Sequence, residues 1–119
     1  MVPRWGVWLE DRFWYDGSPE TRHVQNLNHE SSCVLHLEDG RQAVIVEGRS
    51  TAAEPPGLEF GGRLSAAMSG KYSEHGYAPE PDSWEGPAAG GLRVLTPVTA
   101  LAWFDFPSDM TRFRFPARD

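Results

Sequence analysis

The chain has 119 residues with a formal net charge of −6, which fits one domain spanning residues 1–119. The acidic balance excludes a broad nucleic-acid surface, which would need a basic face. Cys33 is the only cysteine, so an intramolecular disulfide is excluded. No apolar run approaches the roughly 20 residues of a membrane helix, and the front has no apolar signal segment. We therefore expect a cytoplasmic protein with no membrane partner.

The front of the chain predicts a β-hairpin followed by a helix. Residues 2–9 alternate in polarity like a strand, and residues 12–15 form the return strand. Ser18 followed by Pro19 is a helix-start signal, because a hydroxyl caps the helix and proline needs no hydrogen-bond acceptor at the first position. A short surface helix is expected over residues 20–30.

The rest of the chain is expected to be mainly β. Five further strands are predicted at residues 32–37, 42–50, 92–95, 98–104 and 111–115, and a second helix at residues 58–72. Residues 73–91 are rich in Gly, Pro and Glu and predict a mobile surface loop or lid, in which Trp84 is positioned to fold over a bound ring. The pattern indicates a mainly β (α+β) domain, a small closed or half-closed barrel with one or two short helices.

The sequence does not meet the patterns expected of a metal site, a phosphate-binding loop or a hydrolase. The four histidines lack metal-ligand spacing, because His23 and His29 do not share a helix face and His36 falls on the opposite strand face from Cys33. We therefore expect no metal. The sequence also has no phosphate-binding glycine loop, no Gly-x-Ser-x-Gly elbow and no recognisable hydrolase triad.

The informative stretch is the strand that feeds the first helix. Free backbone N–H groups at a helix start favour an anion, and Arg22 adds a bidentate fork suited to phosphate. The sequence therefore predicts an anion site here, and a capped surface helix with a solvated arginine is the alternative interpretation.

Further motifs follow in a characteristic order. The Trp-rich hairpin spans residues 5–15, the helix start spans residues 21–27 (TRHVQNL), and residues 44–48 (VIVEG) end the next strand hairpin. In this order and spacing, over nearly the whole chain, the sequence resembles the pyridoxamine 5'-phosphate oxidase-related family of flavin-binding split barrels, especially small members of the actinobacterial type. The family has a Ser-Arg-Lys-x-x-Asn-Leu helix start. It normally has a helix and a strand before the hairpin, so we expect either a truncated or a reduced member.

The resemblance implies a split β-barrel of about six antiparallel strands that binds FMN, with the deazaflavin F420 as the alternative. The family's Ser/Thr-Arg-Lys triplet holds the cofactor phosphate, which implies this role for Thr21, Arg22 and His23. Because His23 stands where lysine is usual, that contact is expected to be weaker or pH-dependent. The residue near Gln42 is expected to approach the flavin ring.

Two functions from different classes follow. The first is an FMN- or F420-dependent oxidoreductase acting on a small-molecule substrate that the sequence does not name. The alternative is a non-catalytic module that binds a flavin, haem or another small ligand. A true pyridoxamine phosphate oxidase is not expected, because the cationic contacts to the substrate phosphate cannot be placed.

The resemblance also implies a homodimer with shared cofactor sites. Trp8, Trp14 and Trp103 are the expected interface aromatics. In the family the closing strands reach the partner's cofactor, a role that falls to Trp103 and to Arg112 or Arg114. Period two places both arginines on one strand face. A solvent-facing pair on an edge strand is the alternative.

Overall fold

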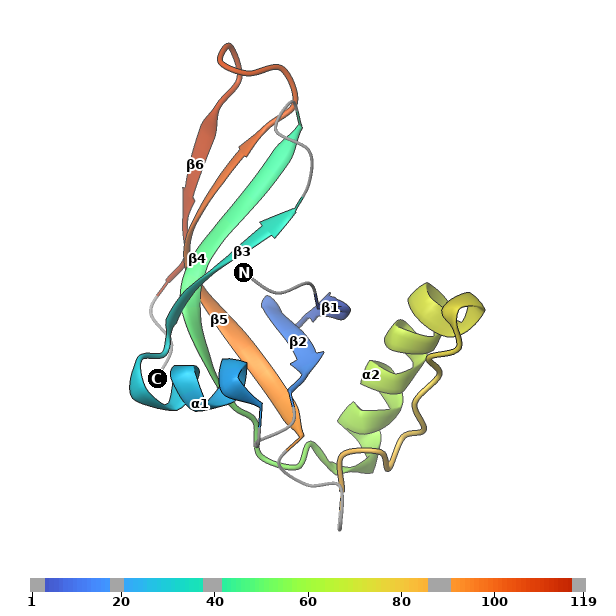
Figure 1. Ribbon diagram of the computed structural model, residues 1–119. Helices are drawn as coiled ribbons and strands as arrows, with labels where there is room; N and C mark the ends of the chain where they lie inside the picture. Colours follow the sequence, from blue (N-terminus) through green and yellow to red (C-terminus); the bar gives the residue numbers. More distant parts are fainter. Residues whose placement is uncertain (1–3, 18–20, 38–41, 86–90, 117–119) are drawn as a thin grey trace.

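The computed structural model describes residues 4–17, 21–37, 42–85 and 91–116. Within these ranges it contains one six-stranded antiparallel sheet, two α-helices and one 3-10 turn (Figure 1). The strands are β1 (Gly6–Leu9), β2 (Arg12–Asp16), β3 (Ser32–Leu37), β4 (Ala43–Ala52), β5 (Leu92–Trp103) and β6 (Thr111–Arg114). The helices are α1 (Arg22–His29) and α2 (Gly57–Tyr72), and the 3-10 turn η1 covers Ser73–His75. The predicted mainly β fold of about six antiparallel strands with two helices is confirmed, and its closure into a split barrel stays a prediction.

The long strand β5 organises the sheet. One edge pairs with β4, whereas the other edge pairs with β2 along residues 92–95 and with β6 along residues 99–102. The register of the β4–β5 ladder shifts between Glu47 and Gly48, opposite Pro97. The two strands predicted at 92–95 and 98–104 are therefore one strand, because a bulge lets it continue past a proline.

Helix α2 closes one side of the sheet near β1 and β2 (Figure 1). Leu64 and Met68 are completely buried in a core cluster shared with the sheet. The other buried members are Val7, Trp14, Trp84, Leu92 and Val94. Two sequence interpretations are corrected here. Trp84 is only 3% exposed and so belongs to the core, not to a lid, and Trp14 is buried within its own chain and does not present an interface aromatic.

The outer part of the sheet forms an arm that extends away from both helices (Figure 1). We define the arm as β3, β6, residues 43–47 of β4 and residues 99–103 of β5, which pair with one another. A second core cluster, built around Phe13, Tyr15, Val46, Leu95 and Ala100, lies at its base. Beyond the base, several large apolar side chains are at least half exposed, among them Val34, Leu37 and Phe113. The arm therefore carries more apolar surface than its own chain covers.

Candidate functional site

The predicted phosphate-binding triplet lies at the start of α1. Thr21 is the N-cap, and its hydroxyl accepts a hydrogen bond from the backbone N–H of Val24 at 3.4 Å. Buried Val24 and Leu27 hold the helix against the sheet. This start differs from the predicted Ser18 cap, and residues 18–20 lie outside the described ranges. Arg22 is consequently the first helical residue, and its side chain is exposed.

A buried polar network lies directly beneath this helix start. The Tyr15 hydroxyl is 3.3 Å from Nε2 of His23 and 2.5 Å from the Ser50 hydroxyl. Nη2 of Arg93 donates to the Ser50 carbonyl oxygen at 2.9 Å. The sequence analysis missed Tyr15, Ser50 and Arg93. The one available signal was an arginine inside the apolar run of residues 92–95, because a charged side chain is rarely buried without a partner.

The network buries one positive charge, that of Arg93, in an acidic protein. Arg93 is only 2% exposed, its Nε has no hydrogen-bond partner, and no carboxylate among the described residues pairs with it. Burial, and then the positive charges of Arg4 and Arg93, lower the pKa of His23 below its ordinary 6.5. A buried cation without a counter-ion is costly, and an anion bound at the helix start would offset that cost.

The lowered pKa of His23 gives a pH prediction for the unliganded protein. Below pH 6.5 the unfolded chain binds a proton at this residue more readily than the folded chain. The contribution of His23 to stability is therefore complete above pH 6.5 and declines as the pH falls below it. In urea unfolding across this range, the free energy of unfolding should fall less with decreasing pH for His23→Gln than for the wild type. Identical pH profiles would refute the lowered pKa of His23.

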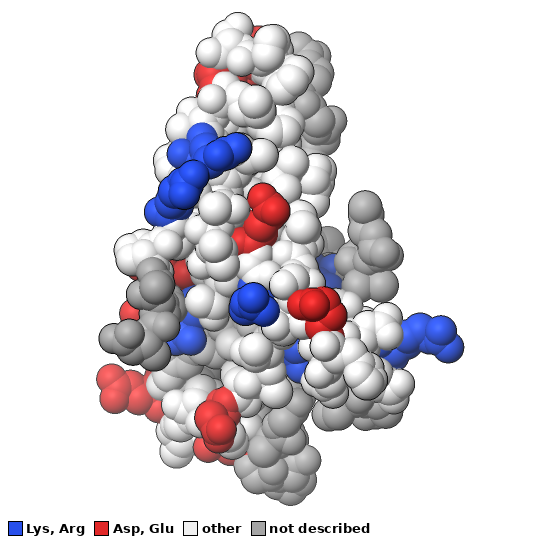
Figure 2. All heavy atoms as spheres, turned by 90° about the vertical axis from the view of Figure 1, so that its left-hand side faces the viewer, with Lys and Arg blue, Asp and Glu red and all other residues white. Residues whose placement is uncertain are grey.

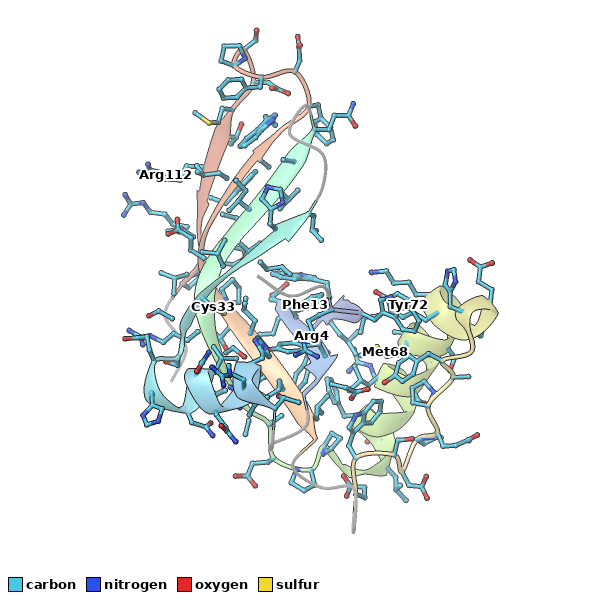
Figure 3. The ribbon with its side chains drawn as sticks, in the orientation of Figure 1. Arg4, Phe13, Cys33, Met68, Tyr72 and Arg112 are labelled. Atoms are coloured by element: carbon cyan, nitrogen blue, oxygen red, sulfur yellow. The ribbon has the colours of Figure 1, made fainter. Side chains whose placement is uncertain are left out.

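The other predicted site residues lie on the arm. Gln42 immediately precedes Ala43, which pairs with Trp103. Arg112 lies opposite Leu101 and Arg114 opposite Thr99, so both arginines share a sheet face with Trp103. All four residues of β6, both arginines included, are exposed, as the alternative interpretation of a solvent-facing pair expects. Figure 3 shows Arg112 projecting outward from β6, and Figure 2 shows a group of basic side chains on that side of the molecule.

The structure therefore divides the seven predicted residues between two places. Thr21, Arg22 and His23 lie together at α1, whereas Gln42, Trp103, Arg112 and Arg114 lie on the arm. The arm points away from α1 in Figure 1. One chain by itself does not bring the two groups into one site.

An open cavity of about 310 Å³ lies beside the start of β1 and the end of β2. It is lined by Arg4, Trp5, Asp16 and Tyr77, none of which the sequence analysis selected. These residues come from the segment before β1, the end of β2 and the segment after η1, so only the folded chain brings them together.

Comparison with protein-family models and with curated proteins finds no match for this chain. The resemblance to flavin-binding split barrels therefore stays a prediction. Among the described residues, neither helix is long and apolar enough to cross a membrane.

Proposed function

We propose that this protein binds a flavin-type cofactor, FMN or the deazaflavin F420, and acts as a cytoplasmic oxidoreductase. The observation that carries the proposal is the buried cation Arg93, which pairs with no carboxylate among the described residues and lies beneath a helix start that presents Arg22 and His23. These groups fit a phosphate, because backbone N–H groups at a helix start and guanidinium groups both favour anions. The bound cofactor would supply the hydride chemistry, and the chain would supply its position and electrostatic surroundings.

Within this proposal, Arg22 and the α1 backbone hold the phosphate. Arg93, buried beneath the helix start, adds a positive electrostatic potential at the phosphate. His23 acts according to its protonation. Because its pKa is lowered, it is neutral at pH 7 and adds charge only in acid. Hydrogen bonds from Tyr15 and Ser50 fix the floor of the site.

Replacing Arg22 with alanine should weaken the binding of FMN or F420 by about 1.5–3 kcal/mol, the scale of a hydrogen bond to a charged group. This corresponds to a rise in Kd of roughly 10- to 150-fold. Fluorescence titration at fixed salt measures it. Arg63→Ala is the matched control, because Arg63 is an exposed arginine on α2 that pairs with Glu10. A Kd for Arg22→Ala equal to that of the control would exclude the α1 site.

We further propose that the working unit is a homodimer whose cofactor sites are shared. The support is the exposed apolar surface of the arm together with the separation of the arm residues from α1 within one chain. Trp8, at 44% exposure, and the partly buried Trp103 remain candidates for the interface. In the dimer, α1 of one subunit would form the phosphate-binding part of the cofactor site. The arm of the other subunit, with Trp103, Arg112 and Arg114, would complete that site.

Sedimentation at micromolar concentration is expected to give a dimer, and a folded monomer would contradict the shared-site proposal. A mixing experiment then tests the sharing itself. An Arg22→Ala subunit and an Arg112→Ala, Arg114→Ala subunit should each bind FMN poorly alone. Their heterodimer should regain one intact site, and no recovery would mean that each site is built by one chain.

A non-catalytic binding module is the second candidate, and the neutral His23 favours it. A histidine that is neutral at pH 7 binds phosphate less strongly than the lysine usual in the resembled family. The two candidates differ in turnover: the oxidoreductase consumes a reductant when its cofactor is bound, whereas the module binds the cofactor without consuming it.

A further inference from the structure

The cavity beside β1 has walls that are held in place from several directions. Trp5 stacks on Tyr72, with 4.9 Å between ring centroids and 10° between planes. The Tyr72 hydroxyl lies 2.9 Å from both the N and the O atom of Gly6, and Nζ of Lys71 donates to the Gly6 oxygen at 3.0 Å. The end of α2 therefore fixes the start of β1, and with it the aromatic wall of the cavity.

Asp16 presents a fixed carboxylate to the same cavity. It accepts hydrogen bonds from the hydroxyl of Tyr77 and, at 2.7 Å, from Nε1 of Trp84. Burial, and then the bond to Asp16, raise the pKa of Tyr77, so this phenol stays neutral and keeps donating. A carboxylate has about four acceptor positions, so Asp16 keeps capacity for a donor on a ligand.

Arg4 supplies a separate cationic group at the cavity wall. Its side chain is exposed, and among the described residues it forms no ion pair with Asp16 or any other carboxylate. The cavity thus offers a cation, a carboxylate and two aromatic rings, whose centroids lie 5.9 Å apart. A volume of about 310 Å³ is near the lower end for ligand sites, which suits a small molecule rather than a three-ring flavin.

We propose that this cavity binds a small planar aromatic acid that also carries an N–H donor. The ring packs against Trp5 and Tyr77, the acid group pairs with Arg4, and the N–H group donates to Asp16. Each group of the ligand has a lining residue of complementary chemistry. The lining residues are not those proposed to hold the cofactor, although the positive charge of Arg4 also acts on His23 at α1. Binding of the aromatic acid is therefore measured with no FMN or F420 present.

Three related probes test the two polar contacts separately. 2-Aminobenzoate carries both groups, benzoate carries only the acid, and aniline carries only the N–H donor. Equilibrium dialysis should give one 2-aminobenzoate per chain, with the other two probes weaker by about tenfold or more, the scale of one hydrogen bond to a charged group. No saturable binding of 2-aminobenzoate, or equal affinity for all three probes, would overturn the proposal.

The variant Arg4→Gln then assigns the acid contact. It should weaken 2-aminobenzoate and benzoate by about tenfold or more and leave aniline unchanged. Arg63→Gln, which removes a positive charge outside the cavity, should leave all three affinities unchanged, and circular dichroism would verify that both variants are folded. Equal losses in the two variants would show that net charge, not the cavity, determines binding.

Discussion

Replacing Leu64 with alanine is expected to lower the free energy of unfolding by about 2–5 kcal/mol. Leu64 is completely buried, in the core cluster where α2 meets the sheet. The substitution removes apolar contacts and leaves a cavity that the surrounding rings, Trp14 and Trp84, fill only in part. Urea unfolding followed by tryptophan fluorescence measures the loss.

Leu58→Ala on the same helix is the matched control. Leu58 is 66% exposed, so its truncation should change stability by no more than about 0.5 kcal/mol. Equal effects of the two substitutions would contradict the packing of α2 on the sheet. The start of β1, and the cavity that depends on it, would then lose their support.

Replacing Gly48 with alanine is expected to destabilise the protein by about 1–3 kcal/mol, the scale of an overpacked site. A Cβ atom at this position would lie 2.3 Å from the carbonyl oxygen of Thr96 and 3.0 Å from Cα of Pro97. Both atoms belong to the backbone of β5, so the added methyl group forces the two long strands apart at the bulge. Thermal and urea unfolding both report the loss.

Gly62→Ala in α2 is the control for the glycine itself. A Cβ atom at Gly62 meets no atom within 4 Å, so alanine should raise stability by about 0.5–1 kcal/mol through its helix preference. Opposite signs at the two positions are therefore expected. A neutral Gly48→Ala variant would mean that β4 and β5 do not approach closely at the bulge.

Local patterns predicted most of the elements because strands and helices are marked by short-range signals. The alternation over residues 2–9 and 12–15 predicted the first hairpin, and the β-branched run predicted β4. The break assigned near Pro97 was wrong, because a bulge beside Gly48 accommodates the proline within one continuous strand. That pairing joins residues distant in the chain and leaves no local signal.

The candidate sites likewise combine residues that a local motif selects with residues that only long-range contacts bring together. The triplet at residues 21–23 is contiguous, and a helix-start motif was sufficient to select it. Arg93 forms a hydrogen bond with Ser50, which is 43 residues away in the sequence, and Trp84 forms one with Asp16, which is 68 residues away. Trp84 was assigned to a lid because its neighbours are Gly- and Pro-rich, whereas tertiary packing places it in the core. Contacts of this kind depend on the sheet's topology rather than on spacing along the chain.

Equilibrium dialysis of the wild-type protein against FMN, and separately against F420, tests the proposed cofactor site most directly. We expect saturable binding of one of the two at one molecule per chain, with a visible absorption band in the protein compartment. Affinity should fall steeply with salt, because arginine side chains and the helix start hold the phosphate. A folded protein that binds neither cofactor saturably would contradict the proposed function.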